Sequence, residues 1–278
     1  MDQEISGYGR AAGLILLPRI TVQLWRGKLG SGEPSVVIYP RFAYVTDYHS
    51  DTVSAYNIAP TTGALTPVPG SPFPTGAVPL SIAVDPSGQF AFAANFDHST
   101  VSAFTIQRST GVLTPVPGSP SPAGSAPSSV TVDPAGKFAY VANDIGSVSA
   151  FNIDPSTGEL TPVTGSPFPT GPGPTAVIVD PSNQFAYVTN SSGVSAYTIH
   201  RTSGALTPVL GPPFPAGSGP YSIAVDPTGK FTYVANSGNG TVSVYTIHRT
   251  TGTLTPVPGS PFRVGPSPSS IITTFAIQ

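Results

Sequence analysis

The sequence predicts an all-β protein, a β-propeller of four-stranded antiparallel blades, and three observations support this. A block of about 47 residues recurs five times, led by phenylalanines 46 to 48 residues apart at Phe42, Phe90, Phe138, Phe185 and Phe231. A second marker, Leu-Thr-Pro-Val, keeps the same step from Leu65 to Leu254. Glycine and proline fall at fixed places in each block. Repeats of this length are typical of stacked units that cannot bury their apolar faces alone.

The third repeat shows how four strands follow one another. Its β-branched and aromatic runs alternate with turn signals, of which Asp-Pro-x-Gly at residues 133–136 is the clearest. The runs predict strand a at 128–132, strand b at 138–142, strand c at 147–153 and strand d at 160–163. Residues 165–174, rich in proline and glycine, are expected to form a long loop to the next blade.

The alternation in strand b predicts how the sheets stack. Phe138 and Tyr140 share one face of the strand, while Ala139 and Val141 share the other, because side chains alternate along a strand. Both faces are apolar and both must be covered. We therefore expect the bulky face of one sheet to lie against the small face of its neighbour.

The domain organisation follows from the repeat. Residues 1–33 form an irregular N-terminal segment, and residues 34–278 form the propeller repeats. The repeats divide at about 34–79, 80–127, 128–174, 175–220 and 221–266, and 267–278 is a closing strand. We expect a sixth blade assembled from both termini, with strands b, c and d at 14–17, 21–25 and 28–32. A five-bladed ring is the alternative.

One strand carries a specific family resemblance. Tyr187-Val188-Thr189-Asn190 is literally the YVTN motif, flanked by Val179-Asp180-Pro181 and by Val-Ser-Ala-Tyr at 194–197. From Pro34 onward the chain resembles the lactonase-like, YVTN-type propeller family, which includes bacterial 6-phosphogluconolactonases, surface-layer proteins and exported proteins. The resemblance implies lactone hydrolysis and usually seven blades. An incomplete seven-bladed ring is therefore a further alternative.

Composition excludes several classes of function. A net charge of −2 gives no reason to expect nucleic acid as a partner, and no apolar segment is long enough for membrane insertion. There is no cysteine, which excludes thiol catalysis and cysteine-based zinc sites. Residues 1–17 lack the pattern of an export signal. We expect a cytoplasmic monomer, and the resemblance makes secretion or the cell envelope the alternative.

Charges sort between the two faces of the predicted ring. The b–c and d–a loops, here called the loop face, carry Asp47, Asp51, Asp97 and Asp144 against one base, Arg263. The opposite turn face has acidic and basic side chains in balance, and it includes His200 and His248. Phosphorylated sugars need cationic or amide-rich sites, so the acidic loop face disfavours them unless Arg10, Arg19, Arg26 or Lys28 reaches it.

The densest ionisable cluster comes from the first two repeats. We expect no cofactor; a divalent cation on the loop face, held by Asp47, Asp51 and Asp97, is the alternative. His49, His98 and Asp97 are the candidate catalytic residues, with loop amides or Arg263 to stabilise a developing oxyanion. The full set of candidate ligand-binding residues is Asp47, Tyr48, His49, Asp51, Asn95, Asp97, His98, Asn143, Asp144, Asn190, Asn236 and Arg263.

Two functions compete. The first is a non-catalytic propeller whose acidic, proline-rich loop face binds a protein or a carbohydrate-like small molecule, since no catalytic motif occurs and the blades are nearly identical. The second, which the resemblance implies, is a lactone hydrolase acting on a sugar lactone. A structural module of a cell envelope is a third alternative.

Overall fold

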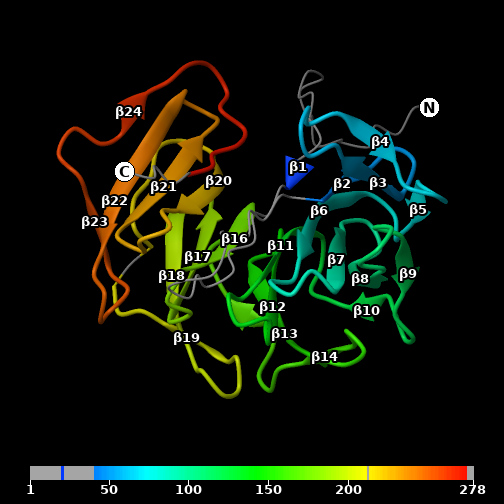
Figure 1. Ribbon diagram of the computed structural model, residues 1–278. Coiled ribbons are helices and arrows are strands. Elements are labelled where there is room, and N and C mark those ends of the chain that lie inside the picture. The colour runs from blue at the N-terminus through cyan, green and yellow to red at the C-terminus, as the bar shows by residue number, and fades with distance from the viewer. Residues whose placement is uncertain (1–19, 22–40, 212, 274–278) are drawn as a thin grey trace, which may run out of the picture.

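Five antiparallel sheets follow one another around an arc in the computed structural model, which describes residues 20–21, 41–211 and 213–273 (Figure 1). Each sheet is one blade, numbered first to fifth in chain order. The propeller fold that the repeat predicts is confirmed. No helix that could span a membrane occurs within these ranges.

Strands b and c of every described blade, and strand a of the second to fifth, are those that the repeat predicts, whereas position a of the first blade is held by residues that precede the repeats. The innermost strands, in position a, are β1 (Ile20–Thr21), β6 (Pro79–Val84), β11 (Pro127–Val132), β16 (Ala176–Val179) and β20 (Pro220–Val225). Position b is held by β2 (Phe42–Asp47), β7 (Phe90–Asn95), β12 (Phe138–Asn143), β17 (Phe185–Asn190) and β21 (Phe231–Asn236). Position c is held by β3 (Thr52–Ile58), β8 (Thr100–Ile106), β13 (Ser147–Ile153), β18 (Gly193–Ile199) and β22 (Thr241–Ile247).

The outer edge is divided into two strands in four of the five described blades, which the sequence did not predict; the fourth blade has a single bridge, Val194 to Phe214, in place of the second strand. The first part of the edge is the Leu-Thr-Pro segment: β4 (Leu65–Pro67), β9 (Leu113–Pro115), β14 (Leu160–Pro162), β19 (Leu206–Pro208) and β23 (Leu254–Pro256). A second part pairs with the other half of strand c: β5 (Phe73–Pro74), β10 (Ser121–Pro122), β15 (Phe168–Pro169) and β24 (Phe262–Arg263). The predicted loop 165–174 therefore contains a strand.

A serine hydroxyl bridges the break between the two outer parts. Ser119 Oγ accepts the backbone N–H of Ala103 at 2.8 Å, and Ser166 Oγ accepts that of Ala150 at 2.9 Å. These two N–H groups lie between the paired ends of strand c. The serine of Gly-Ser-Pro thus satisfies a strand donor that would otherwise have no partner in the sheet.

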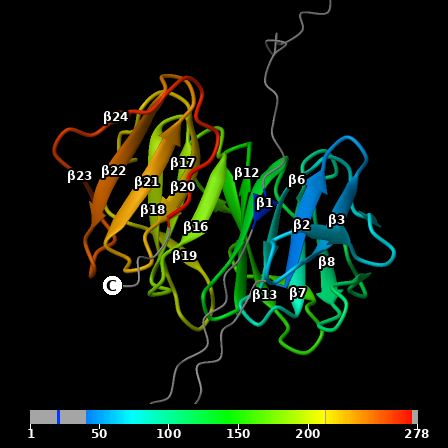
Figure 2. The ribbon, with the colours of Figure 1, turned by 45° about the horizontal axis from the view of Figure 1, so that its top comes forward.

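Neighbouring blades stack as the side-chain alternation predicts (Figure 2). Phe138 and Tyr140 of the third blade share a buried cluster with Ala186 and Val188 of the fourth. The Tyr140 hydroxyl also donates to the Gly204 carbonyl in the c–d turn of the next blade, at 3.0 Å. Tyr44 and Tyr187 make the same bond to Gly111 and Gly252. Burial raises the pKa of the Tyr140 hydroxyl, with a smaller contribution from the charge of Asp133.

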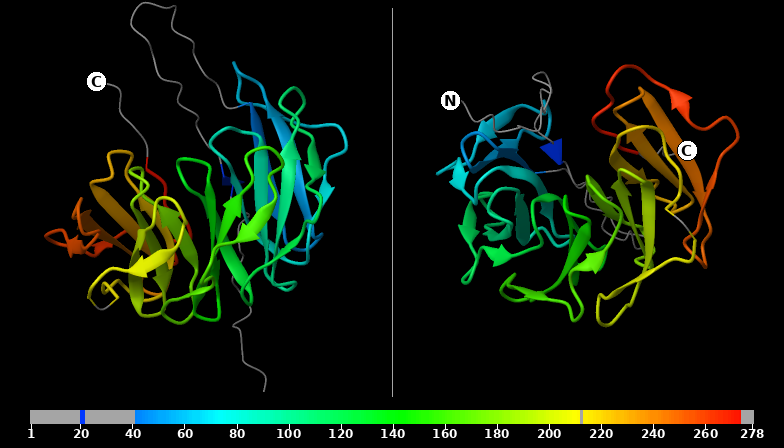
Figure 3. Two further views of the ribbon diagram at one scale, coloured as in Figure 1. Left: turned by 90° about the horizontal axis from the view of Figure 1, so that it is seen from below. Right: turned by 180° about the vertical axis from the view of Figure 1, so that it is seen from behind.

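The two ends of the arc correct the expected closing blade (Figure 3). Thr21, expected in its strand c, lies in β1 and pairs with Tyr44 of the first blade. Residues 269–273, within the expected closing strand 267–278, have no strand partner, although Ile271 N donates to Ser222 Oγ of β20 at 3.3 Å. The proposed strands at 14–17 and 28–32 lie outside the described residues, as do residues 22–25.

Candidate functional site

The loop face of the first two blades is organised around residues 75–78, the segment that leads into β6. Asp51 Oδ1 accepts the N–H of Val78 at 2.8 Å, and His98 Nδ1 accepts the N–H of Ala77 at 3.0 Å. Asp51 follows β2, whereas His98 follows β7. One short segment therefore holds the b–c loops of two blades side by side.

His98 has a defined orientation because of this contact. A neutral imidazole that accepts a hydrogen bond at Nδ1 carries its proton on Nε2. The exposed side of the ring is then a donor. His98 is consequently suited to donate to a carbonyl or developing oxyanion oxygen, and not to serve as the base.

His49 and Asp97 are the groups of the cluster that remain available to accept a proton. Both are exposed, and among the described residues no hydrogen bond engages the Asp97 carboxylate or the His49 ring. The His49 ring lies against Tyr48, with ring centroids 4.0 Å apart. The backbone N–H of His49 donates to Asp47 Oδ1 at 3.0 Å, and this bond is the main cause of the lowered pKa of Asp47.

The asparagines that end strand b do not reach a ligand, which corrects their inclusion in the binding set. Their side chains are fully buried beneath the d–a loop that leads into their own blade, and the four are Asn95, Asn143, Asn190 and Asn236. A β-carbon added to Gly124 would lie 2.4 Å from Asn143 Nδ2. In the second blade, Asn95 Nδ2 donates to Thr100 Oγ1 and Ser102 Oγ, while Thr75 donates to its Oδ1. These amides hold the loops in place.

Two other candidates also stand apart from the cluster. Arg263 lies in β24, the outer part of the fifth blade, where it pairs with Thr241 at the far end of the arc from His49 and His98 (Figure 1). Asp144 belongs to the third blade, and its backbone carbonyl accepts the N–H of Gly173 in the loop that leads to the fourth. Among the residues that the structure describes, no group of three or more His, Cys, Asp or Glu side chains is arranged to hold a metal ion.

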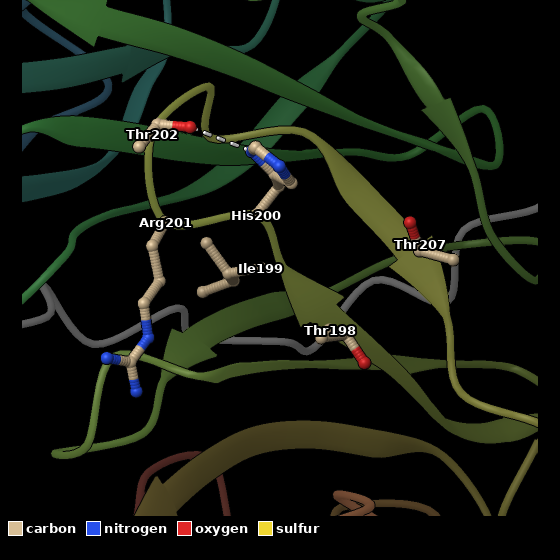
Figure 4. Close-up of a pocket in the computed structure, with 6 residues that line it drawn as sticks. All are labelled: Thr198, Ile199, His200, Arg201, Thr202 and Thr207. Carbon is tan, nitrogen blue, oxygen red and sulfur yellow. Dashed lines mark hydrogen bonds between the residues drawn. The ribbon is translucent and has the colours of Figure 1, made fainter.

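A hollow of about 360 Å³ lies elsewhere, on the fourth blade next to its c–d turn (Figure 4). It is lined by Thr198, Ile199, His200, Arg201, Thr202 and Thr207. His200 Nδ1 is bonded to Ser203 Oγ at 2.8 Å and accepts the Ser203 N–H, so the ring caps its own turn. The side chains of His200 and Arg201 point in different directions. They do not converge on one ligand atom, and the hollow carries no evident chemistry.

The residues that sequence reasoning missed are those that fix the cluster. Ala77 and Val78 supply the backbone N–H groups, and Val78 adopts a φ of 56°, which is rare for a β-branched residue. Backbone donors give no compositional signal. The one signal in the sequence that could have indicated this segment is its position in the chain between two polar b–c loops.

The family model described as lactonase, seven-bladed β-propeller, matches residues 21–122 and 120–271. No curated protein matches the sequence. A proposed 6-phosphogluconolactonase from Bacteroides uniformis is similar at TM-score 0.71, with 21% identity over 82% of this chain and 70% of the other.

Two more solved structures are similar to the same degree. A proposed 6-phosphogluconolactonase from Bacteroides fragilis has TM-score 0.70 and 20% identity over 84% of this chain and 70% of its own. The periplasmic gluconolactonase of Pseudomonas aeruginosa has TM-score 0.69 and 21% identity over 83% and 69%. At these identities the likeness shows the fold.

Proposed function

Because the chain belongs to the lactonase family of seven-bladed β-propellers, we propose that it is a lactone hydrolase whose reacting groups lie on the loop face of the first two blades. The family match across residues 21–271 is the observation that carries the proposal. It favours the hydrolase over the binding module that sequence reasoning placed first. The clamped segment 75–78 supports the location, because it brings ionisable side chains from two loops together.

The chemistry divides between a base and a donor. Hydrolysis requires a base to take a proton from water as its oxygen bonds to the lactone carbonyl carbon. We assign the role of this base to His49 or Asp97. The carbonyl oxygen gains negative charge, and His98 Nε2–H is the donor that stabilises it. The ring C–O bond then breaks, the leaving oxygen takes a proton, and a hydroxy acid results.

The charge of the loop face supports an uncharged substrate. Among the described residues, its four aspartates are opposed only by Arg263, which is at the other end of the arc. A phosphate group would meet carboxylates there without a cationic partner. We therefore favour a neutral sugar lactone as substrate, and no cofactor.

The test compares two pairs of histidines. Hydrolysis of D-glucono-1,5-lactone by the purified protein is followed by acid release at constant pH. The double variant His49→Ala/His98→Ala should lose at least about a hundredfold in rate, the range expected for general acid–base groups. The matched control, His200→Ala/His248→Ala, changes two histidines of the turn face and should retain the rate. Equal rates in both double variants would remove the assignment, and absence of turnover in the unmodified protein would contradict the proposed activity.

A further inference from the structure

Segment 75–78 is closed over Asp51, which lies in the b–c loop of the first blade. The Asp51 carbonyl accepts the N–H of Thr75 at 2.9 Å, and its carboxylate Oδ1 accepts the N–H of Val78 at 2.8 Å. Between these two bonds, the N–H of Ala77 donates to His98 Nδ1 at 3.0 Å. One residue of the first blade therefore holds the segment that contacts the histidine of the second.

Val78 requires this support because of its backbone conformation. Its φ of 56° lies in the left-handed region, where a β-branched residue is strained. The equivalent residues before the third, fourth and fifth blades also have positive φ, between 55° and 65°, but they are Ala126, Gly173 and Gly219. Glycine accepts this conformation without a steric cost. The second blade thus has the bulkiest side chain at the position where the backbone tolerates bulk least.

The side chain that anchors this position weakens in step with the strain. Val78 is held by the carboxylate of Asp51 at 2.8 Å, and Ala126 by the hydroxyl of the equivalent Ser99 at 3.3 Å. In the next loop Gly146 takes the place of Asp51 and has no side chain, and the residue it faces is the unstrained Gly173. A charged acceptor makes a stronger hydrogen bond than a neutral one. The strongest anchor therefore coincides with the most strained residue.

We propose that Asp51 is a positioning residue for His98. Its carboxylate holds Val78 in the left-handed conformation, the N–H of Ala77 is thereby directed at His98 Nδ1, and the ring keeps its proton on the exposed Nε2. In the third blade Ile145 takes the place of His98 and has no acceptor for such an N–H. This role replaces the cation-binding role that the sequence suggests for Asp51, because Oδ1 is engaged by the backbone.

The catalytic consequence rests on the proposed hydrolase. An Nε2–H that stabilises a developing oxyanion has to be present and correctly aimed at every turnover. A ring that changes tautomer or turns away from Ala77 loses this donor for part of the time. The orientation of His98 itself does not depend on any activity, so a spectroscopic measurement tests it separately.

NMR of protein labelled with 15N in histidine and alanine measures the orientation directly. At about pH 8 an ordinary histidine is neutral, and His98 should show a single Nε2–H tautomer with a scalar coupling from its Nδ1 to the nitrogen of Ala77. Asp51→Gly keeps the carbonyl, accepts the φ of 55° and removes the carboxylate. In this variant the coupling should disappear, and the ring shifts of His98 should move toward those of the exposed His49.

Three further variants separate positioning from a general loosening of the loop. Asp51→Asn retains a side-chain oxygen and should retain the coupling. Asp51→Gly/Val78→Gly reproduces the glycine pair of the later loop and should regain the coupling, because the strain is removed together with its anchor. Asp47→Ala removes a carboxylate that bonds the His49 N–H within the same loop, and it should leave His98 unchanged. An unchanged His98 in Asp51→Gly overturns the proposal, and so does a double variant that regains nothing.

Rates of D-glucono-1,5-lactone hydrolysis show whether the positioned donor serves the reaction. Asp51→Gly should lower kcat by at least about tenfold with little change in KM, and Asp51→Asn should retain most of the rate. Loss of the coupling without loss of rate would support the positioning by Asp51 and contradict the role of His98 in hydrolysis. Absence of turnover in the unmodified protein would contradict the hydrolase alone, since the coupling is measured without substrate.

Discussion

The hydroxyl of Thr75 donates a 2.8 Å hydrogen bond to Asn95 Oδ1 beneath the loop face of the second blade. The third and fifth blades have Ala123 and Ala216 in place of Thr75. In those two blades the buried Oδ1 atoms of Asn143 and Asn236 have no hydrogen-bond partner among the described residues. A buried acceptor without a donor lowers stability.

Ala123→Thr should therefore stabilise the protein. A donor for Asn143 Oδ1 is expected to raise the free energy of unfolding by about 1 kcal/mol. Urea denaturation measures the change. Ala123→Val is the matched control, because valine has the shape of threonine without the hydroxyl. If valine stabilises as much as threonine, the effect arises from apolar burial and not from the hydrogen bond.

Asn183 of the fourth blade should stabilise the a–b turn of the third blade, which contains Asp133. Its Nδ2 donates to Asp133 Oδ2 at 2.6 Å across the blade boundary. Asp85 and Asp180 instead accept hydrogen bonds from the hydroxyls of Ser87 and Ser182 within their own turns, where the turn of Asp133 has Ala135.

Asn183→Gly should lower the free energy of unfolding by about 1–2 kcal/mol, since glycine accepts the φ of 56° but leaves the carboxylate oxygen without its donor. Adding Ala135→Ser should restore most of the loss, because serine supplies the missing hydroxyl. Thermal or urea unfolding of the single and double variants measures both effects. If the double variant is no more stable than Asn183→Gly alone, this explanation is contradicted.

The tyrosine that joins neighbouring blades should make stability fall at alkaline pH. The pKa of Tyr140 is raised in the folded protein by burial, so the unfolded chain ionises first, near pH 10. The contribution of the neutral Tyr140 hydroxyl to the free energy of unfolding is therefore fully present below about pH 10. It is lost as the pH rises toward the pKa of Tyr140 in the folded protein.

Tyr140→Phe should lower the free energy of unfolding by about 1–3 kcal/mol at neutral pH, because the Gly204 carbonyl loses its donor. In this variant the free energy of unfolding should also fall less steeply as the pH rises above about 10. Urea denaturation at pH 8 to 11 tests both effects, with the half-buried Tyr48→Phe as control. An unchanged alkaline slope in Tyr140→Phe would exclude this tyrosine as a contributor.

Asp154 should titrate below an ordinary aspartate. Hydrogen bonds from the Ser156 hydroxyl and from the backbone N–H groups of Ser156 and Thr157 lower its pKa to about 2. Because the folded pKa is lowered, its contribution to stability is present above pH 4 and is lost as the pH falls toward 2. Carboxyl chemical shifts measured by NMR between pH 1.5 and 6 give the midpoint. Ser156→Ala should move that midpoint upward, and a midpoint near 3.9 in the unmodified protein would contradict the assigned bonds.

The acidic loop face should distinguish between lactones by charge. D-Glucono-1,5-lactone should be hydrolysed at least about tenfold more efficiently than its 6-phosphate, judged by kcat/KM, because the phosphate would lie near carboxylates without a cation. Reversal of this preference would indicate a cationic contribution from outside the described residues. Arg10, Arg19, Arg26 and Lys28 are the first candidates for replacement in that case.

Much of the fold was predictable because its signals are periodic. In the third repeat Phe138 and Tyr140 alternate with Ala139 and Val141, and the other repeats have the same pattern. This alternation determines both the strands and the faces that meet. The outer strands such as β15 were missed because two residues next to proline leave no alternation to detect. Thr21 was assigned to strand c of a closing blade because residues 1–33 do not match the repeat. In the structure β1 pairs with β2 of the first blade instead.

The site was only partly predictable, for a different physical reason. Strand order places His49 and His98 in b–c loops on one face, and segment 75–78 bonds both of these loops through Asp51 and His98. The orientation of a side chain does not follow from strand order. Asn143 therefore turned inward instead of toward a ligand, and the direction of His98 depends on one backbone N–H.

The divided outer edge disfavours edge-to-edge strand pairing between molecules, although only 9% of the residues are charged. A long row of open N–H and C=O groups would be a template for another strand, and charged side chains usually block it. Here four of the five described edges offer segments of two or three residues, separated by a serine that turns back into its own sheet and prolines that have no N–H to offer. Replacing these interruptions with an unbroken strand would convert the rim into a surface for fibre growth.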